Sequence, residues 1–396
     1  MTGPLSGITV VEFADYVTGP YAAVLLADLG ARVIKLEAPG HGDPFRGWGE
    51  GGYSPTFCSV NRGKESVALD LRVPAAQEVA RALVARADVF IENHRPGVAE
   101  RLGLGYESLR AQNPRLVYCS ISGFGQEGPY RERPGYDTIG QALGGLLSLL
   151  TDWEQPRAMG ISLSDHLAGI FAAYGILGAL VARERTGQGQ RVTTSLLEAT
   201  VAFIGENAAR YFATGEVPDR AYRTRLAQVY AFVAGDGRPF VIHLSSPQKF
   251  FVGLARAIER PELAEDPRFR DRAGRVAHHA ELERLLAEVF RQQPRAYWLA
   301  RLEAEDVPAA PLYTLEEVFA DPQVRHLELE GRVRHPRRGE VRLVRGAVQL
   351  DGQRTGSSLP PPELGEHTEA VLQELGYDAA AIAQLRAAGA LGGREA

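Results

Sequence analysis

Apolar runs alternate with helical patterns through the first half of the chain. Runs typical of strands lie at 8–13, 32–37, 89–91, 116–121 and 190–195. Segments with the period of a helix lie at 18–29, 75–87, 106–112 and 139–185, and one more extends to about residue 213. Apolar strands that alternate with helices are typical of a parallel sheet covered by helices. The pattern therefore predicts an α/β fold.

The pattern changes after residue 213. The polar segment 214–225 has no clear period and predicts a linker. Two apolar runs joined at Asp236-Gly237 then predict a β-hairpin, and helices follow it. We interpret 226–325 as a smaller α+β domain and 326–345 as a second linker. The tail, 365–391, returns to a helical pattern.

The chain shows no clear membrane or export signal. Its longest apolar stretch, 167–182, has 16 residues, whereas a bilayer span needs about 20. Asp165 precedes this stretch and Arg183 follows it, so we expect a helix buried on all sides and no membrane association. The start of the chain, 1–13, lacks the basic and apolar regions of a signal peptide.

Composition narrows the possible functions. The 396 residues carry 44 basic and 49 acidic side chains, for a net charge of −5, so we do not expect nucleic-acid binding. Cys58 and Cys119 are the only cysteines in the sequence, which indicates a reducing, cytoplasmic compartment and no metal site. Lys35, Lys64 and Lys249 stand against 41 arginines, a bias typical of a GC-rich genome.

A dinucleotide site is weakly indicated. The turn after the first strand reads ADYVTGPYAA, in which Gly19 is the only glycine, so the G-x-G-x-x-G pattern of dinucleotide-binding folds is missing. Glu37 ends the second strand, where such enzymes hold a ribose. One acid without the glycines is insufficient, and we expect no nucleotide redox cofactor.

Two aspartates are candidates for chemistry. Ser164-Asp165 precedes the long apolar helix, a position at which an aspartate ordinarily serves as N-cap. A partly desolvated carboxylate at the same place can instead attack an activated acyl group. Asp137, in the turn Gly135-Tyr136-Asp137, is a second candidate acid, and its ordinary role would be to cap the helix that follows.

Eight segments in order resemble one family along nearly the whole chain. They include LSGITVVEFADYVTGPYAAVLLADLGARVIKLEAPGHGDPFR, PGYDTIGQALGG and SDHLAG, and they lie at 5–46, 61–71, 87–109, 113–130, 134–145, 164–169, 186–192 and 364–377. On these segments the chain resembles the family III CoA-transferases, the group that includes formyl-CoA transferase and carnitine CoA-transferase.

The resemblance implies an architecture. The large domain, with a Rossmann-like sheet, would be built from 1–213 and 346–396. The small domain 226–325 would be inserted in it through the linkers 214–225 and 326–345. Each monomer would form an open ring, and two rings would interlock as a homodimer.

The resemblance also implies an activity. CoA would move from an acyl-CoA donor to a free carboxylic acid through an aspartyl–acyl anhydride and an enzyme–CoA thioester. Asp165 would be the nucleophile, with Tyr136 and Asp137 beside it. The CoA contacts would fall on Val17, Ala38, Asn93, His94 and Arg101.

The chain departs from formyl-CoA transferase at positions near the expected site, which bears on whether the two enzymes share substrates. Val17 replaces a glutamine near the catalytic carboxylate, and Ala38 replaces an arginine that contacts CoA. The glycine-rich lid loop of that enzyme has no counterpart between 220 and 250. These differences argue against exchange between formyl-CoA and oxalate.

Two other functions compete with CoA transfer. An α-methylacyl-CoA racemase resembles the chain but uses a histidine in a G-H-D turn, and here Tyr136 takes its place. Phenols titrate near pH 10 in model compounds, so tyrosine is a poor substitute for imidazole. A catalytically silent CoA-binding protein is the other alternative, and the presence of Asp165 argues against it.

Overall fold

The structure, a computed structural model, describes residues 3–391 and divides into two compact units. The first unit comprises Met1–Leu147, Ala158–Glu206 and Arg325–Ala396, and the second comprises Ser148–Arg157 and Asn207–Val324. The first unit is therefore built from three separate stretches of the sequence. The short stretch 148–157 belongs to the second unit, an assignment that the sequence pattern does not indicate.

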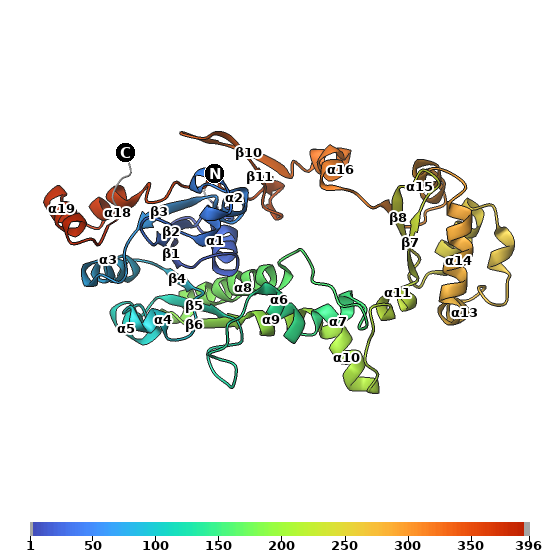
Figure 1. Ribbon diagram of the computed structural model, residues 1–396, viewed down its shortest axis with the longest axis horizontal. Coiled ribbons are helices and arrows are strands. Elements are labelled where there is room, and N and C mark those ends of the chain that lie inside the picture. Colours follow the sequence, from blue (N-terminus) through green and yellow to red (C-terminus); the bar gives the residue numbers. More distant parts are fainter. Residues whose placement is uncertain (1–2, 392–396) are drawn as a thin grey trace. The chain divides into compact units, whose positions relative to one another are not determined.

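A parallel sheet of six strands forms the centre of the first unit (Figure 1). Its strands are β1 (Thr9–Phe13), β2 (Arg32–Glu37), β3 (Lys64–Ala68), β4 (Val89–Glu92), β5 (Val117–Ser122) and β6 (Arg191–Ser195). They lie in the order β3-β2-β1-β4-β5-β6, and every pair is parallel. This is the strand order of dinucleotide-binding folds, with its reversal between β1 and β4. The predicted α/β class with a parallel sheet is confirmed.

Helices cover both faces of the sheet because successive strand residues point to opposite sides. Val10 of β1 belongs to the core under α1 (Thr18–Asp28), α8 (Leu163–Thr186) and α9 (Leu196–Phe203). Its neighbour Val11 belongs to the core on the other face. That core is completed by α3 (Pro74–Ala85), α5 (Tyr106–Gln112), α18 (Thr368–Glu374) and α19 (Ala379–Ala387).

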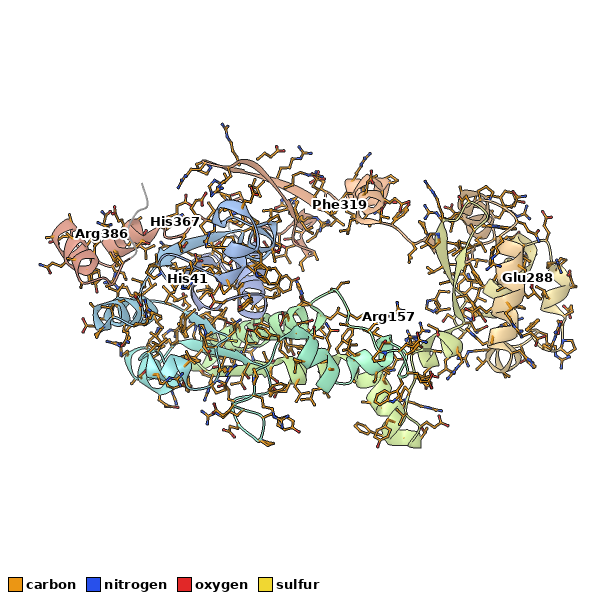
Figure 2. The ribbon with its side chains drawn as sticks, in the orientation of Figure 1. His41, Arg157, Glu288, Phe319, His367 and Arg386 are labelled. Carbon is orange, nitrogen blue, oxygen red and sulfur yellow. The ribbon has the colours of Figure 1, made fainter. Side chains whose placement is uncertain are left out.

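The end of the chain folds back onto the outer strand β3. The amide of Ala68 donates to Thr368 Oγ1 over 3.0 Å, and the amide of Ser66 donates to Nδ1 of His367, which Figure 2 labels, over 3.2 Å. Val371 and Ile382 contribute to the same core as β1 and β2. In Figure 1, α18 accordingly lies beside β3, and α19 lies beyond α18.

The long apolar helix α8 is covered on one side only, so the expectation of a helix buried on all sides is wrong. Ala168 and Ile176 are fully buried against α1 and the sheet. Ile170, Tyr174 and Val181 on the uncovered side are 45%, 74% and 57% exposed. By length and composition alone, α8 could cross a membrane.

Shorter elements complete the first unit. They are two 3-10 turns (Pro44–Trp48 and Glu50–Gly52), α2 (Pro55–Asn61), α4 (Val98–Arg101), α6 (Asp137–Leu143) and α7 (Leu146–Leu150), the last of which extends into the second unit. The segment 326–345, expected to be a linker, contains an antiparallel hairpin of β10 (Glu330–His335) and β11 (Gly339–Val344). A second small hairpin pairs β12 (Gln349–Leu350) with β13 (Gln353–Arg354).

The second unit has its own core. Its antiparallel sheet pairs β7 (Val229–Val233), β8 (Pro239–His243) and β9 (Ala309–Pro311). Its main helices are α10 (Gly205–Thr214), α11 (Tyr222–Ala227), α12 (Gln248–Ala257), α14 (His279–Phe290) and α15 (Arg295–Ala304). Phe240 and Phe290 meet edge to face in this core, with ring centroids 5.0 Å apart.

Candidate active site

A cavity of about 210 Å³ opens at the carboxyl edge of the parallel sheet. It lies outside the ends of β1, β4 and β5, where open α/β sheets bind their ligands. Every residue that lines it belongs to the first unit. Side chains with polar or charged groups in this lining are Asp15, Tyr16, Thr18, Asn93, His94, Arg95, Ser122, Arg131, Arg133, Tyr136 and Asp165.

Asn93 holds the loop between β1 and α1 against the end of β4. Its Oδ1 accepts from the amide of Asp15 over 3.0 Å. Its Nδ2 donates to the carbonyl oxygen of Asp15 over 2.7 Å and to Thr18 Oγ1 over 2.9 Å. Three hydrogen bonds from one amide side chain fix the loop that forms one wall of the cavity.

Tyr16, in the middle of this loop, has the left-handed backbone conformation, with φ 64°. For a residue with a bulky side chain this conformation costs about 1–2 kcal/mol, so the surroundings must enforce it. The ring of Tyr16 meets Tyr136 edge to face at 5.9 Å and Phe45 at 5.4 Å. The strained backbone thus directs an aromatic ring to the cavity.

Asp165 lies in the first turn of α8, and Ser162 is the N-cap of that helix. The interpretation of Ser164-Asp165 as an N-cap is therefore wrong. The amide of Asp165 donates to Asp137 Oδ1 over 3.1 Å, and Asp137 Oδ2 accepts from Gln141 Nε2 over 2.5 Å. Asp137 itself lies in the first turn of α6, so its carboxylate joins the starts of two helices.

The carboxylate of Asp165 is half-buried and unpaired. Within residues 3–391, neither of its oxygens has a hydrogen bond or an ion pair, although its amide is bonded. Burial, together with the negative charge of Asp137, raises the pKa of Asp165 to about 7. Near neutrality part of the Asp165 population is therefore ionised, as a partly desolvated carboxylate that can act as a nucleophile.

The structure brings some of the expected CoA contacts to this cavity and leaves others outside. Val17, Asn93 and His94 line it. The ring of His94 packs on Phe13 at 4.1 Å, and burial, with the nearby Lys35 ammonium, lowers its pKa to about 4. Ala38 and Arg101 are exposed and are not part of the lining.

Sequence reasoning missed several residues of the site. Asp15 and Tyr16 line the cavity, as do Arg95, Arg131 and Arg133. The arginines of the segment RERPGYD immediately precede the tyrosine–acid turn, a signal that could have indicated them. Guanidinium groups at a cavity mouth favour carboxylate and phosphate ligands, to which they donate paired hydrogen bonds.

Glu37, the acid that could have held a ribose, has hydrogen bonds to both of its carboxylate oxygens. Arg46 donates to both of its oxygens over 2.7 Å, and Ser66 Oγ donates to one of them over 2.5 Å. The pair lies in the interior, so Glu37 is structural. The described residues also contain no group of three or more histidine, cysteine or acidic side chains suited to a metal ion.

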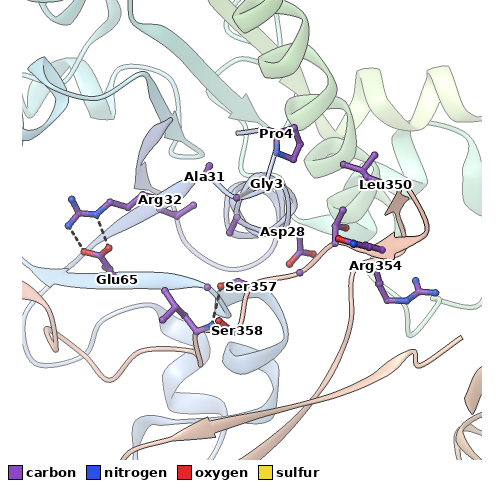
Figure 3. Close-up of a pocket in the computed structure, with 18 of the residues that line it drawn as sticks. Gly3, Pro4, Asp28, Ala31, Arg32, Glu65, Leu350, Arg354, Ser357 and Ser358 are labelled. Carbon is purple, nitrogen blue, oxygen red and sulfur yellow. Dashed lines mark hydrogen bonds and ion pairs between the residues drawn. The ribbon is translucent and has the colours of Figure 1, made fainter. Parts of the chain in front are cut away.

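A second, larger cavity of about 760 Å³ lies at the amino ends of β2 and β3 (Figure 3). Most of the charged side chains in its lining are engaged with other side chains or with main chain, whereas Asp351 is exposed. Arg32 pairs with Glu65 at 2.7 Å, Arg62 pairs with Asp28, and Arg354 donates to two carbonyl groups. Asp165 differs from Asp28 and Glu65 because, within residues 3–391, it has no basic partner.

Comparison with known proteins decides the family. The model of CoA-transferase family III matches residues 5–368. The chain belongs to this family. Like the curated transferases it matches, it is an acyl-CoA:carboxylate CoA-transferase.

The transferase is similar to enzymes named for several acids. It is 35% identical to mouse succinyl-CoA:glutarate CoA-transferase over 98% of this chain and 90% of the mouse protein. It is 41% identical to acetyl-CoA:oxalate CoA-transferase of Acetobacter aceti over 81% and 84% of the two chains. It is 36% identical to succinyl-CoA–D-citramalate CoA-transferase of Chloroflexus aurantiacus over 94% of each.

Solved structures share the fold of the transferase. A CaiB/BaiF family protein from Brucella suis superimposes with a TM-score of 0.85 at 36% identity, over 95% of this chain and 100% of that one. The Mycobacterium tuberculosis protein Rv3272 superimposes with a TM-score of 0.83 at 31% identity, over 93% and 99%.

Proposed function

We propose that the transferase moves CoA from an acyl-CoA donor to a free dicarboxylic acid, with Asp165 as the nucleophile. One observation carries the proposal. Asp165 presents an unpaired, half-buried carboxylate to a cavity at the carboxyl edge of the sheet. A carboxylate held in this way is poised to attack an acyl carbon.

The first half of the reaction transfers CoA to the enzyme. An Asp165 oxygen attacks the thioester carbonyl, the C–S bond breaks, and an aspartyl–acyl anhydride and CoA thiolate result. The thiolate then attacks the aspartyl carbonyl, the anhydride C–O bond breaks, and the donor acid leaves. Asp165 is now a thioester of CoA.

The second half repeats these steps with the acceptor. Its carboxylate attacks the Asp165 thioester and expels the thiolate, which then attacks the acyl carbonyl of the acceptor. Acyl-CoA leaves and the Asp165 carboxylate is restored. The net reaction exchanges one thioester for another, so no nucleotide is consumed. Exclusion of water from the cavity around Asp165 would limit hydrolysis of both intermediates.

The arginines at the cavity support a dicarboxylate as the acid. The relatives named above act on glutarate, oxalate and D-citramalate, all of which carry two carboxylates. While one carboxylate of such an acid reacts at Asp165, the other needs a cation. Arg131 and Arg133 line the cavity on the same segment as Tyr136 and supply that charge.

CoA is proposed to approach along the loop between β1 and α1. Val17, Asn93 and His94 would contact its thiol-bearing arm, because they line the cavity. Arg101 and Ala38, the residue after β2, do not line the cavity and would lie beside parts of CoA further from its thiol. Arg101 is close to Arg131, since both guanidinium groups lie beside Gly97, and together they suit the phosphates of CoA.

We also propose a cytoplasmic homodimer of interlocked rings. The uncovered side of α8 supports it, because Tyr174 and Val181 would otherwise remain in water. Two free, buried cysteines, Cys58 and Cys119, suit a reducing compartment.

The test is an exchange assay combined with intact mass. Succinyl-CoA and acetyl-CoA are offered with glutarate, oxalate or malate, and the new acyl-CoA is followed with time. We expect exchange and a covalent CoA adduct in the wild type, and neither in Asp165→Ala. Exchange that survives this substitution would refute Asp165 as nucleophile. Deuterium uptake at the α-carbon without exchange would favour the racemase, and CoA binding without either would favour the silent protein.

A further inference from the structure

Lysine is rare in this chain, and two of its three lysines are completely buried. The sequence has three lysines against 41 arginines. Lys35 and Lys64 are at most 1% exposed, whereas Lys249 lies on the surface and pairs with Asp306. Lysine is among the side chains least often buried in proteins. Genome composition explains why lysine is rare, but not why the lysines that remain lie in the interior.

The ammonium of Lys35 is surrounded by three oxygen atoms. It lies 2.7 Å from Glu12 Oε1, 3.0 Å from Asp43 Oδ2 and 2.6 Å from the carbonyl oxygen of Ala14. An ammonium has three N–H donors and no acceptor, so the number of oxygens matches the number of donors.

The ammonium of Lys64 has the same kind of environment. It lies 2.6 Å from Glu12 Oε2, 2.9 Å from Asn61 Oδ1 and 3.0 Å from the carbonyl oxygen of Pro20. Glu12 therefore bridges the two lysines, one oxygen to each. A planar guanidinium with five donors does not fit either set of three oxygens, which explains why arginine does not replace lysine here.

The two lysines hold the two ends of one loop. Ala14 precedes the β1–α1 loop and Pro20 lies in the first turn of α1, so both carbonyl groups that accept from the lysines flank the cavity wall. Asp43, the partner of Lys35, also accepts from the amide of Tyr16 at 3.4 Å. The strained residue Tyr16 thus lies between the carbonyl groups of Ala14 and Pro20, to which the two lysines donate.

The four charged side chains of the cluster depend on one another because their charges balance. Lys35 and Lys64 match Glu12 and Asp43, and all four are buried. Buried ions are tolerated only when they are paired, and removal of one partner leaves an uncompensated charge. The cluster therefore resists rearrangement.

We propose that Lys35 and Lys64 are positioning residues that hold the β1–α1 loop, and with it Tyr16, in the conformation that lines the cavity beside Asp165. Neither lysine touches the cavity. The effect on catalysis rests on the proposed function, whereas the effect on the loop does not.

Hydrogen exchange tests the effect on the loop. Wild type, Lys35→Met, Lys64→Met and the surface control Lys249→Met are compared by mass spectrometry on peptides covering residues 14–21. The amides of residues 15, 16 and 21 are hydrogen bonded in the structure. We expect their exchange to accelerate at least about tenfold in the two buried-lysine variants and to stay unchanged in the control. Peptides of β5 should exchange as in wild type, which separates loop release from global unfolding.

Steady-state kinetics tests the catalytic effect. We expect kcat to fall about 10- to 100-fold, the cost of a small misplacement at a reacting centre, with a smaller change in the KM for acyl-CoA. Lys64→Arg should not restore kcat. The pair Lys64→Met with Glu12→Gln removes one charge of each sign, so it should regain the Tm of wild type while its loop stays unprotected and its kcat stays low.

The outcomes separate the two proposals. Unchanged loop exchange and unchanged kcat in both buried-lysine variants would overturn the positioning role. Recovery of kcat together with Tm in the charge-balanced pair would also overturn it, because the lysine would then serve stability alone. If wild type shows no CoA exchange while the variants release the loop, the proposed function fails and the positioning role stands. Should Lys35→Met fail to fold, the Lys64 variants decide the question.

Discussion

The amide of Asp165 donates a hydrogen bond of 3.1 Å to the carboxylate of Asp137. The bond joins the first turn of α8 to the first turn of α6, so the position of the proposed nucleophile depends on a second helix. It also places a negative charge beside Asp165, which, after burial, is the second cause of its raised pKa. Asp137 therefore orients Asp165, and its charge raises the fraction of Asp165 that is protonated near neutrality.

The charge of Asp137 should be visible in the pH dependence of exchange. Asp165 attacks as the anion, so kcat/KM should fall as the pH drops through its pKa of about 7. Asp137→Asn keeps an acceptor and removes the charge, and the midpoint should move to lower pH. The midpoint should stay above the usual pKa range of aspartate because burial, the larger cause of the raised pKa, is unchanged by the substitution. Asp152→Asn, on the surface, is the control, and an unmoved midpoint in Asp137→Asn would contradict the assignment.

Ionised Asp165 should reduce the stability of the fold. Its pKa is raised on folding, so the folded state holds the proton more tightly, and stability is lost as the pH rises from about 4 to about 7. Asp165→Asn should therefore raise the free energy of unfolding at pH 8 by about 1–3 kcal/mol and change it less at pH 4.5. Urea unfolding at both pH values measures this. A destabilised variant at pH 8 would show that the carboxylate is structural.

Removal of the Asn93 side chain should release the cavity wall. Asn93→Ala deletes three hydrogen bonds of the β1–α1 loop, and we expect kcat/KM for acyl-CoA to fall about 10- to 100-fold. Asn113→Ala is the matched control. Asn113 also bonds main chain, at Ala87 and Arg115, but at the amino edge of the sheet. The control should lose stability, by about 1–3 kcal/mol, and keep its activity; equal losses of activity in both would argue against a role for the loop.

The uncovered side of α8 should mediate association. Tyr174→Glu and Val181→Glu place a charge on its exposed apolar side, and sedimentation should then show monomer at concentrations at which we expect the wild type to form the proposed dimer. Arg185→Glu, on the charged end of the same helix, should leave the dimer intact. Identical masses for all four proteins would place the contact elsewhere.

The sheet was predictable where its strands are apolar. Residues of β1, β4 and β5 fill cores on both faces and are mostly apolar, and β2 keeps the apolar residues Val33, Ile34 and Leu36 among its charged ones. The strand β3 was missed because it begins with Lys64 and Glu65, which resemble surface residues. Lys64 is instead completely buried and paired with Glu12, and Glu65 is paired with Arg32. Local composition shows neither partner.

The candidate site was only partly predictable. Asp165, Asp137 and Tyr136 were identified from short segments in order, and the structure places them together. Tyr16 was not identified, since no glycine marks its left-handed backbone. Its conformation is enforced by Asp43 and Asn93, which lie 27 and 78 residues from their partners in the loop. Contacts at such separations leave no trace in a local pattern.

The return of the C-terminus to β3 has a consequence for protein synthesis. Thr368 accepts from the amide of Ala68, 300 residues earlier, and α18 and α19 complete a core that begins at β1. A ribosome adds about 5–20 residues per second, so the nascent sheet waits about 15–60 s with one face incomplete. A stop codon shortly before α18 would remove part of the core itself, and the released chain would be a substrate for chaperones and proteases despite lacking only about 30 of its residues.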